Sequence, residues 1–505
     1  MYYAKEIRWA LFLISALLFG VLLVNAFWVP APPSSQAEPC LGVPVVAPED
    51  IPEETSCPMD YIDRFLFNGE KAAVDGGSKT IYIPQPVSQS TTREDLTGAL
   101  TISVPNQQLY FLEDANFENL PQAVAQGHGF TVAVTHGRHS HFYHVVFTTL
   151  PVLRMESQTK QEQENGVPEV FGQMCLWDVD GNAPVTSELF FHARGDTSLR
   201  FPKKSWKLSL KTSSLKNNHV SLLGLGSDDD WILNAMFMDD TKLKENFLTQ
   251  IWNALAEQSS WNEPMSACEY VEVILDGSYQ GVYLLQRRVD QKYLDLSDED
   301  VLFKGYGTAS ISSFQEAFEI KYSHLPNDEA YALVKGLYAQ ADVSSIDVDN
   351  FVDISIFLQL GCLCDNASYK NMYYCLKKEA SGYRLTMIPW DADLALGVTW
   401  LGDYNGYDYE YALSKEAKRQ EYAQIALYPD LEERIQERWQ KLRKDVLSTQ
   451  NLLGQMEELI QRLGQSGAYS RDIQRWGLYH EGPDTQEAAV RFLEERLILL
   501  DGLYE

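Results

Sequence analysis

The order of the secondary-structure signals constrains the fold of this chain more than any other feature. Alternating apolar residues, which are typical of strands, dominate residues 151–290. One helical pattern interrupts them at residues 240–255, with Asp239 or Asp240 available as its N-cap, and helical patterns dominate after Asp349. A β-rich half that contains one helix and precedes a helical half predicts an α+β fold with two lobes. The clearest strands are predicted at residues 188–193, 204–211, 270–275 and 281–285.

The last helix of the chain has a start signal and a buried face. Residues 483–487 begin it with a capping-box pattern. Val490, Leu493, Leu497 and Leu500 then recur at helical spacing. We expect this apolar stripe to pack against the rest of the helical half.

An uncharged, mostly apolar run covers residues 9–29. As a helix it would be roughly 31 Å long, which is enough to span a bilayer. Lys5 and Arg8 precede the run and acidic residues follow it, so the positive-inside rule places the N-terminus inside and the main body outside the cytoplasmic membrane. A cleaved signal peptide is the alternative, because Val24, Asn25 and Ala26 offer a cleavage site. The sequence favours a single-pass transmembrane anchor at residues 1–30.

Three further regions follow the anchor. Residues 31–95 are rich in Pro, Ser and acidic residues and are interpreted as a linker, with one short strand predicted at residues 81–83. Residues 96–149 carry short strand-like runs separated by Gly, Asn and Asp, which indicates a small β module. Residues 150–505 form the two-lobed domain, with an N-lobe at about 150–290 and a C-lobe at about 291–505.

The β module is rich in histidine. His139 and His141 would share one face of a strand, so a metal site is one interpretation. Histidines on the surface and in turns are the favoured alternative, because no carboxylate or cysteine is placed to complete a site. The five histidines of this segment are His128, His136, His139, His141 and His144.

The charge and the cysteines of the chain limit its partners and its covalent structure. The formal net charge is −30, which repels phosphodiester backbones, argues against nucleic acid as a partner and favours basic proteins. Because the seven cysteines are odd in number, disulfides are not the organising principle. Cys40 and Cys57 are the candidates for a pair outside the cell.

A turn with glycine and hydroxyl residues lies between two predicted strands. It contains Arg194, Gly195 and Ser198, and the next strand carries Lys204 and Lys207 in the segment PKKSWK. The amides of such a turn can approach phosphate while a lysine neutralises its charge, so these five residues are candidate phosphate-binding residues. Strand positions three apart face opposite sides, so only one of the two lysines can point into a site, and Lys207 is favoured. The tripeptide RGD at residues 194–196 also spells an integrin-recognition motif, but it belongs to this longer pattern.

Two more segments of the strand-rich half stand out. The first combines DWILNA at residues 230–235 with DTKLKEN at residues 240–246. The second is DGSYQGVYLLQ at residues 276–286, which reads as a hairpin that ends at Gln286.

The most specific segments are DNASYKNMYY at residues 365–374 and MIPWDADLALG at residues 387–397. Phosphoryl transfer needs a carboxylate to orient the attacking hydroxyl, and oxygen ligands to hold Mg²⁺ against the phosphates. Asp365 suits the first role, whereas Asn371, Asp391 and Asp393 suit the second. The alternative is that these polar residues cap helices and turns. The strands predicted at residues 371–376 and 383–388 form a hairpin that would return Asp391 close to Asn371.

Taken in order, these segments resemble the CotH kinase family over roughly residues 150–505. The resemblance implies a protein-kinase-like fold with a β-rich N-lobe and a helical C-lobe. It implies an atypical protein kinase that transfers the γ-phosphate of ATP to Ser or Thr of a protein at the cell or spore surface. The implied cofactors are ATP and Mg²⁺, with Asp365 as the base-like residue, Asn371, Asp391 and Asp393 as metal ligands, and Gln286 next to the hinge that meets the nucleotide. The basic, Ser-rich substrates of the family suit an acidic protein.

The chain departs from this pattern at two points. Arg287 stands where family members often have glutamate, and Asp365 precedes Asn371 by one residue more than in ordinary protein kinases. The alternative function is therefore a kinase-like surface-binding or structural module without turnover. GxSxG, HExxH and Walker A patterns do not occur in the sequence, which removes the commonest hydrolase, zinc-protease and P-loop interpretations.

Overall fold

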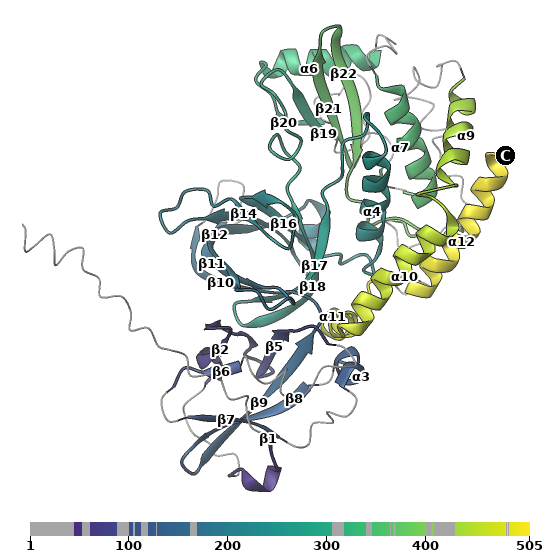
Figure 1. Ribbon diagram of the computed structural model, residues 1–505. Helices are drawn as coiled ribbons and strands as arrows, with labels where there is room; N and C mark the ends of the chain where they lie inside the picture. Colours follow the sequence, from purple (N-terminus) through teal and green to yellow (C-terminus); the bar gives the residue numbers. More distant parts are fainter. Residues whose placement is uncertain are drawn as a thin grey trace, which may run out of the picture.

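The protein is an α+β protein, as predicted, with a β module, a closed β-barrel and a C-terminal region of hairpins and helices (Figure 1). The barrel lies between the other two parts. The apolar run at residues 9–29 lies outside the described residues, and no helix among the described residues is long and apolar enough to cross a membrane. The computed structural model describes residues 45–52, 61–87, 100–104, 107–112, 120–127, 129–161, 169–305, 318–339, 346–363, 365–366, 370–399, 406–408, 430–480, 482 and 484–505.

Seven strands close the barrel in the order β10-β11-β12-β13-β16-β18-β17. β10 and β17 pair in parallel, and the other neighbours are antiparallel. The strands are β10 Val152–Gln161, β11 Glu169–Trp177, β12 Val185–Arg194, β13 Ser205–Lys211, β16 Asp230–Asn234, β17 Cys268–Leu275 and β18 Ser278–Arg287. They include all four strands predicted for this part of the chain. A separate two-stranded sheet consists of β14 Val220–Ser221 and β15 Ser227–Asp228.

Strand β18 is apolar on both faces because both faces are covered. Tyr283 and Leu285 lie in the barrel interior, whereas Val282 and Leu284 pack in a second core with helix α4 (Lys244–Glu257). Successive side chains of a strand alternate between its two faces, so the continuous run at residues 282–285 is what a doubly covered strand requires.

Helix α4 begins later than the predicted residue 240. Lys242 has a φ of 59°, which is left-handed and breaks the helical path before Lys244. Asp239 still satisfies the helix start, because its Oδ2 accepts the backbone N–H of Lys244 at 2.9 Å. Asp240 instead accepts the backbone N–H groups of Tyr479 and His480.

The N-terminal β module is larger than predicted. Its main sheet has the order β1-β7-β8-β9-β5-β4, and a smaller one has the order β3-β2-β6. Residues 61–87, which the sequence analysis placed in the linker, are folded and supply β2 to β5. The predicted strand at residues 81–83 is β5, which pairs in parallel with β9. The elements are β1 Val45–Val46, β2 Phe65–Phe67, β3 Glu70–Lys71, β4 Ala73–Asp75, β5 Thr80–Pro84, β6 Leu100–Ile102, β7 Gln108–Leu112, α3 Leu120–Ala125, β8 Gly129–His136 and β9 His139–Thr148.

The histidines of β8 and β9 do not gather around a common point. His139 is exposed and His141 is buried. Among the described residues, the groups of side chains close enough to share a metal include none of His136, His139, His141 and His144. His128 lies outside the described residues.

The β module and the barrel share one hydrophobic core. Ile274, Tyr279 and Trp177 of the barrel pack in the core of the β module. Tyr82 of β5 stacks on Tyr279 with ring centroids 4.7 Å apart and planes within 1°. Asp75 also accepts the backbone N–H of Tyr279 at 2.9 Å. The two parts therefore depend on each other for burial, although the sequence divides them at residue 150.

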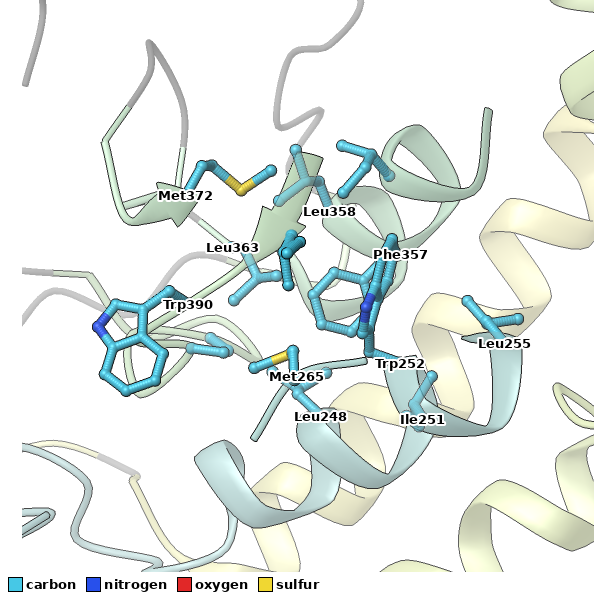
Figure 2. Close-up of a cluster of buried hydrophobic side chains, with 14 of the residues drawn as sticks. Leu248, Ile251, Trp252, Leu255, Met265, Phe357, Leu358, Leu363, Met372 and Trp390 are labelled. Carbon is cyan, nitrogen blue, oxygen red and sulfur yellow. The ribbon is translucent and has the colours of Figure 1, made fainter. Parts of the chain in front are cut away.

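The C-terminal region joins a four-stranded sheet to a set of helices. The predicted hairpin is confirmed, because β21 and β22 pair from Met372–Pro389 to Glu379–Gly382 in the sheet β20-β19-β21-β22. Figure 2 shows the core beneath it, where Trp252 of α4 meets Phe357 of α7 with ring centroids 5.3 Å apart. The elements are β19 Val301–Gly305, β20 Phe318–Tyr322, α6 Asn327–Ala339, α7 Val348–Gly361, β21 Met372–Glu379, β22 Gly382–Pro389, α9 Leu431–Leu442, α10 Thr449–Gln465, α11 Ala468–Trp476 and α12 Gln486–Leu503.

Helix α11 is fixed to the barrel by two buried ion pairs. Arg471 Nη2 lies 2.6 Å from Glu272 Oε1 of β17. Asp472 Oδ2 lies 2.5 Å from Lys203 Nζ and accepts the backbone N–H of Val282 at 2.9 Å. Only glycine fits at position 281, because an added Cβ would lie 2.2 Å from Asp472 Oδ2.

The predicted C-terminal helix belongs to the main core. Thr485 caps α12 by accepting the backbone N–H of Ala488, and Leu493, Leu497 and Leu500 are fully buried. We expect Leu497→Ala to lower the free energy of unfolding by about 2–5 kcal/mol, because truncation leaves a cavity. Ile498→Ala on the exposed face of α12, where Ile498 is 74% exposed, is the control. Equal denaturation midpoints for the two variants would contradict a core position for this helix.

Candidate functional site

A cavity of about 330 Å³ opens between the barrel and the C-terminal region. Both parts contribute charged side chains to its wall. Seven of the residues selected from the sequence line it: Arg194, Gly195, Ser198, Asp365, Asn371, Asp391 and Asp393. The fold therefore brings together segments that are up to about 200 positions apart in the chain.

The turn after β12 is tight because of its glycine. Gly195 has a φ of 117°, in the region that side chains disfavour, and an added Cβ would lie 1.8 Å from Ser198 Oγ. The short 3₁₀ helix Thr197–Arg200 follows at once. A side chain at residue 195 would push the turn away from the cavity, so glycine keeps its backbone on the wall.

Asp365 is held by two neighbours from its own loop. Lys370 Nζ lies 2.6 Å and 2.8 Å from its two carboxylate oxygens, and Asn371 Nδ2 donates to Oδ2 at 3.0 Å. Burial raises the pKa of Asp365 above its usual value, the contacts of Lys370 oppose this, and the charge of Asp391 adds to the rise. Asp365 is thus a carboxylate in a fixed orientation whose proton affinity responds to the charge of the site.

Asn366 explains how the loop accommodates its extra residue. Its Nδ2 donates to the backbone oxygens of Asn371 at 3.0 Å and Trp390 at 2.7 Å. The backbone N–H of Trp390 also donates to the oxygen of Asn371 at 3.0 Å. Asn366 therefore fastens the two ends of the hairpin together and places Asn371 next to Asp391.

The residues that follow the hairpin are tied to helix α4. Asp391 has a φ of 59°, a conformation that a non-glycine residue needs its neighbours to maintain. The next amide, of Ala392, donates to Glu245 Oε2 of α4 at 2.5 Å. Burial, followed by the charge of Asp391, raises the pKa of Glu245 to about 8. Burial and then the charges of Asp391 and Glu245 raise the pKa of Asp393 well above its usual value.

Several cations that line the cavity were not among the candidate residues selected from the sequence. Lys304 of β19 and Lys321 of β20 line it together with Lys370. Burial, and then the charge of Arg194, lowers the pKa of Lys304 to about 8. Lys370 stands in a quoted motif, so its position could have been found, as could that of Glu245. Lys304 and Lys321 stand in ordinary strand patterns that carry no such signal.

Three residues selected from the sequence do not line the cavity within the described part of the chain. Lys204 Nζ binds the backbone oxygens of Leu199 and Phe201 and thereby closes the turn. Lys207 Nζ lies 3.5 Å from Asp230 Oδ1 on the barrel. Gln286 is buried within β18. Neither lysine of the favoured pair therefore reaches the site in this conformation, and the positive charges on the cavity wall come from other residues.

An ionic cluster fills the region where β18 ends. Arg287 Nη2 lies 3.0 Å from Asp228 Oδ2, and Lys292 Nζ lies 2.7 Å from Asp228 and 2.6 Å from Asp229. Arg288 reaches Asp230 at 3.4 Å. The acidic run at residues 228–230 is therefore largely neutralised by cations of the protein, and the departure at Arg287 has a structural role.

A second acidic group lies near the start of α4 and is also paired with cations of the protein. Lys244 Nζ contacts Asp484 at 2.7 Å and Asp239 at 3.3 Å. His480 contacts Asp240 and Asp484, and these hydrogen bonds outweigh burial and raise its pKa to about 9. Lys244 and His480 therefore offset most of the negative charge of the three carboxylates Asp239, Asp240 and Asp484.

The main cavity has the donors that Mg²⁺ and phosphate require. Carboxylate and amide oxygens of Asp391, Asp393 and Asn371 share one wall, and hard oxygen ligands are those that Mg²⁺ prefers. Burial and then the neighbouring carboxylates raise the pKa values of Asp393 and Glu245, so Asp391, Asp393 and Glu245 lie close enough to repel one another when ionised. A divalent cation bound there would neutralise these carboxylates, and Arg194 and Lys304, which also line the cavity, carry the positive charge that a phosphate group requires.

The site combines a fixed carboxylate, a group of oxygen ligands and a glycine turn, which is the set of parts that phosphoryl-transfer sites use. A family model described as CotH kinase protein matches residues 191–498. The chain belongs to the CotH kinase family, as its sequence motifs indicated. A search of curated proteins found no match.

Proposed function

We propose that this protein is an atypical protein kinase that transfers the γ-phosphate of ATP to Ser or Thr of a protein substrate. The observation that carries the proposal is the convergence of Asp365, Asn371 and Asp391 in one cavity with the turn at Gly195. Membership of a kinase family supports it. In this proposal the barrel serves as the N-lobe and the C-terminal region as the C-lobe of a kinase-like fold.

The proposed roles follow from position. Asp365 orients the acceptor hydroxyl and takes up its proton, because Lys370 and Asn371 fix the carboxylate on the cavity wall. Asn371, Asp391 and Asp393 would hold Mg²⁺, which would neutralise the charge that develops on the phosphates. The turn at residues 195–198 would present its amides to the phosphates, with Arg194 and Lys304 as the cations.

The proposed partner and location rest on charge and on the N-terminal run. A net charge of −30 favours a basic, Ser-rich acceptor protein through faster encounter. The proposed location is the outer face of the cytoplasmic membrane, with the run at residues 9–29 as the anchor and the spore or cell surface as the place of action.

Calorimetric titration of the full-length protein with a non-hydrolysable ATP analogue tests the proposal. We expect binding in the presence of Mg²⁺ and its loss in EDTA, together with transfer of labelled phosphate from ATP to a basic, Ser-rich peptide. The same peptide with every Ser and Thr replaced by Ala is the control. A protein that binds no nucleotide under either condition would overturn the proposed kinase activity.

A binding module without turnover is the second candidate, and one observation favours it. The ionic cluster of Arg287, Lys292 and Asp228 occupies the end of β18, where a kinase-like fold would receive the adenine. Charged side chains that are already paired make a poor surface for an apolar base. Binding of a basic, Ser-rich protein without any binding of nucleotide is the outcome expected for this function.

A further inference from the structure

Trp390 occupies the junction between the core and the cavity. It directly precedes Asp391 and is only 3% exposed. Figure 2 shows its ring at the edge of the buried cluster that contains Leu248, Met265 and Leu363. Tyr373 packs edge-on against it with ring centroids 5.5 Å apart. Both backbone polar groups of Trp390 are bonded, to Asn371 and Asn366. The ring is therefore held in one place.

Two cations from different parts of the fold meet this ring. Arg194 Cζ, at the end of barrel strand β12, lies 5.8 Å from the ring centroid. Lys304 Nζ, on β19 of the C-terminal region, lies 5.4 Å from it. Both residues line the cavity. The indole thus lies next to positive charge from each side of the cleft.

Arg194 and Lys304 both lie against the ring of Trp390, and two neighbouring cations repel each other. After burial, the charge of Arg194 is the largest cause that lowers the pKa of Lys304. The negative face of an indole attracts each cation and so offsets part of that repulsion. An anion with several negative charges that binds both cations would offset the remaining repulsion between them.

We propose that Trp390 is a positioning residue that holds Arg194 and Lys304 together as a two-cation site for the polyphosphate chain of the nucleotide. This inference rests on the proposed kinase function and adds the residues that grip the phosphates. It also assigns the phosphate-binding lysine to β19, in place of Lys204 and Lys207 of the barrel. Because the two cations come from opposite sides of the cavity, a bound polyphosphate would fasten those sides to each other.

A double-mutant cycle tests this coupling. The dissociation constant for Mg²⁺–ADP would be measured by calorimetry for the wild type, Trp390→Leu, Arg194→Gln and the double variant. We expect Trp390→Leu to weaken binding roughly ten-fold, because both cations lose their ring contact. The double variant should bind more tightly than the product of the two single losses predicts, because Arg194→Gln already removes one of the two cations through which Trp390 acts. If the fold-changes in the dissociation constant of the two single variants simply multiplied in the double variant, the inference would be overturned, because Trp390 and Arg194 would then act independently.

Two further variants separate positioning from general damage. Trp390→Phe keeps an aromatic face and should recover most of the affinity lost in Trp390→Leu. Trp252→Leu removes another fully buried tryptophan from the same core and should leave the affinity of the folded protein unchanged. Equal losses in Trp252→Leu and Trp390→Leu would contradict a specific role. A wild type that binds no nucleotide would overturn the kinase proposal itself, whereas wild-type binding without coupling would overturn only the role of Trp390.

Discussion

Replacing Asp365 with asparagine is expected to lower the rate of phosphoryl transfer by about 10²–10⁴-fold, the range that a positioned general base contributes. Magnesium-dependent nucleotide binding should survive, because the proposed partner of Asp365 is the acceptor hydroxyl and not the metal. Asparagine retains the shape of the side chain and an acceptor for Lys370, which contacts Asp365 at 2.6 Å. Transfer to a basic, Ser-rich peptide and binding of an ATP analogue are the two measurements.

Asp391→Ala is the matched comparison for that experiment. It removes a proposed metal ligand, so both nucleotide binding and transfer should be lost. The two carboxylates line the same cavity, and only their proposed roles separate the outcomes. If both variants kept full transfer activity, the assignment of the site would be wrong.

Removing the carboxylate of Asp472 should have the largest effect on stability. Asp472→Ala leaves Lys203, which is 1% exposed, without its partner at 2.5 Å, and deletes the acceptor of the Val282 amide. Breaking a buried ion pair from one side costs about 3–5 kcal/mol. Chemical denaturation of Asp472→Ala beside the double variant Lys203→Met/Asp472→Leu measures this. The double variant should be the more stable of the two, since it does not leave the charge of Lys203 buried without its carboxylate partner.

The ion pair of Lys203 and Asp472 also predicts how the stability lost in Asp472→Ala depends on pH. Burial already lowers the pKa of Lys203 to about 8 with Asp472 present, and without the carboxylate the pKa should fall further. The unfolded chain then binds more protons than the folded variant, so the stability of Asp472→Ala should rise towards that of the wild type as the pH increases to about 8. If the difference in the free energy of unfolding between the wild type and Asp472→Ala did not depend on pH between 6 and 8, the buried charge of Lys203 would not be its cause.

Local patterns in the sequence predicted much of the fold because they report local physics. The hairpin at residues 372–389 alternates apolar residues around a short turn, and the stripe ending at Leu500 needs a covered face. Both signals lie within one element and require no knowledge of its neighbours. The position of Asn371 and Asp391 in one cavity could be predicted for the same reason, since one hairpin connects them.

The structure differs from the sequence-based expectations where distant segments decide the outcome. Residues 61–87 lack a sustained apolar period, yet β5 is fully buried because β9 and Tyr279 cover it. The three lysines at and just before the start of β13 also differ in their contacts, which their spacing in the sequence cannot reveal. Lys203 is buried by α11, Lys204 closes its own turn, and Lys207 pairs with Asp230. Lys304, one of the cations that line the cavity, comes from a strand more than 90 positions away.

The barrel closes through strands that lie before the family match begins. That match starts at residue 191, inside β12, whereas β10 and β11 occupy residues 152–177 and close the barrel by the parallel pairing of β10 with β17. A protein trimmed to the match would lose β10, β11 and most of β12, would leave β17 without its parallel partner, and would open the interior around Val271 and Val273 to water. Unpaired edges next to exposed apolar surface recruit strands from other molecules. We therefore expect a protein that keeps β10 and β11 to be more stable than one trimmed to the residues that match the family.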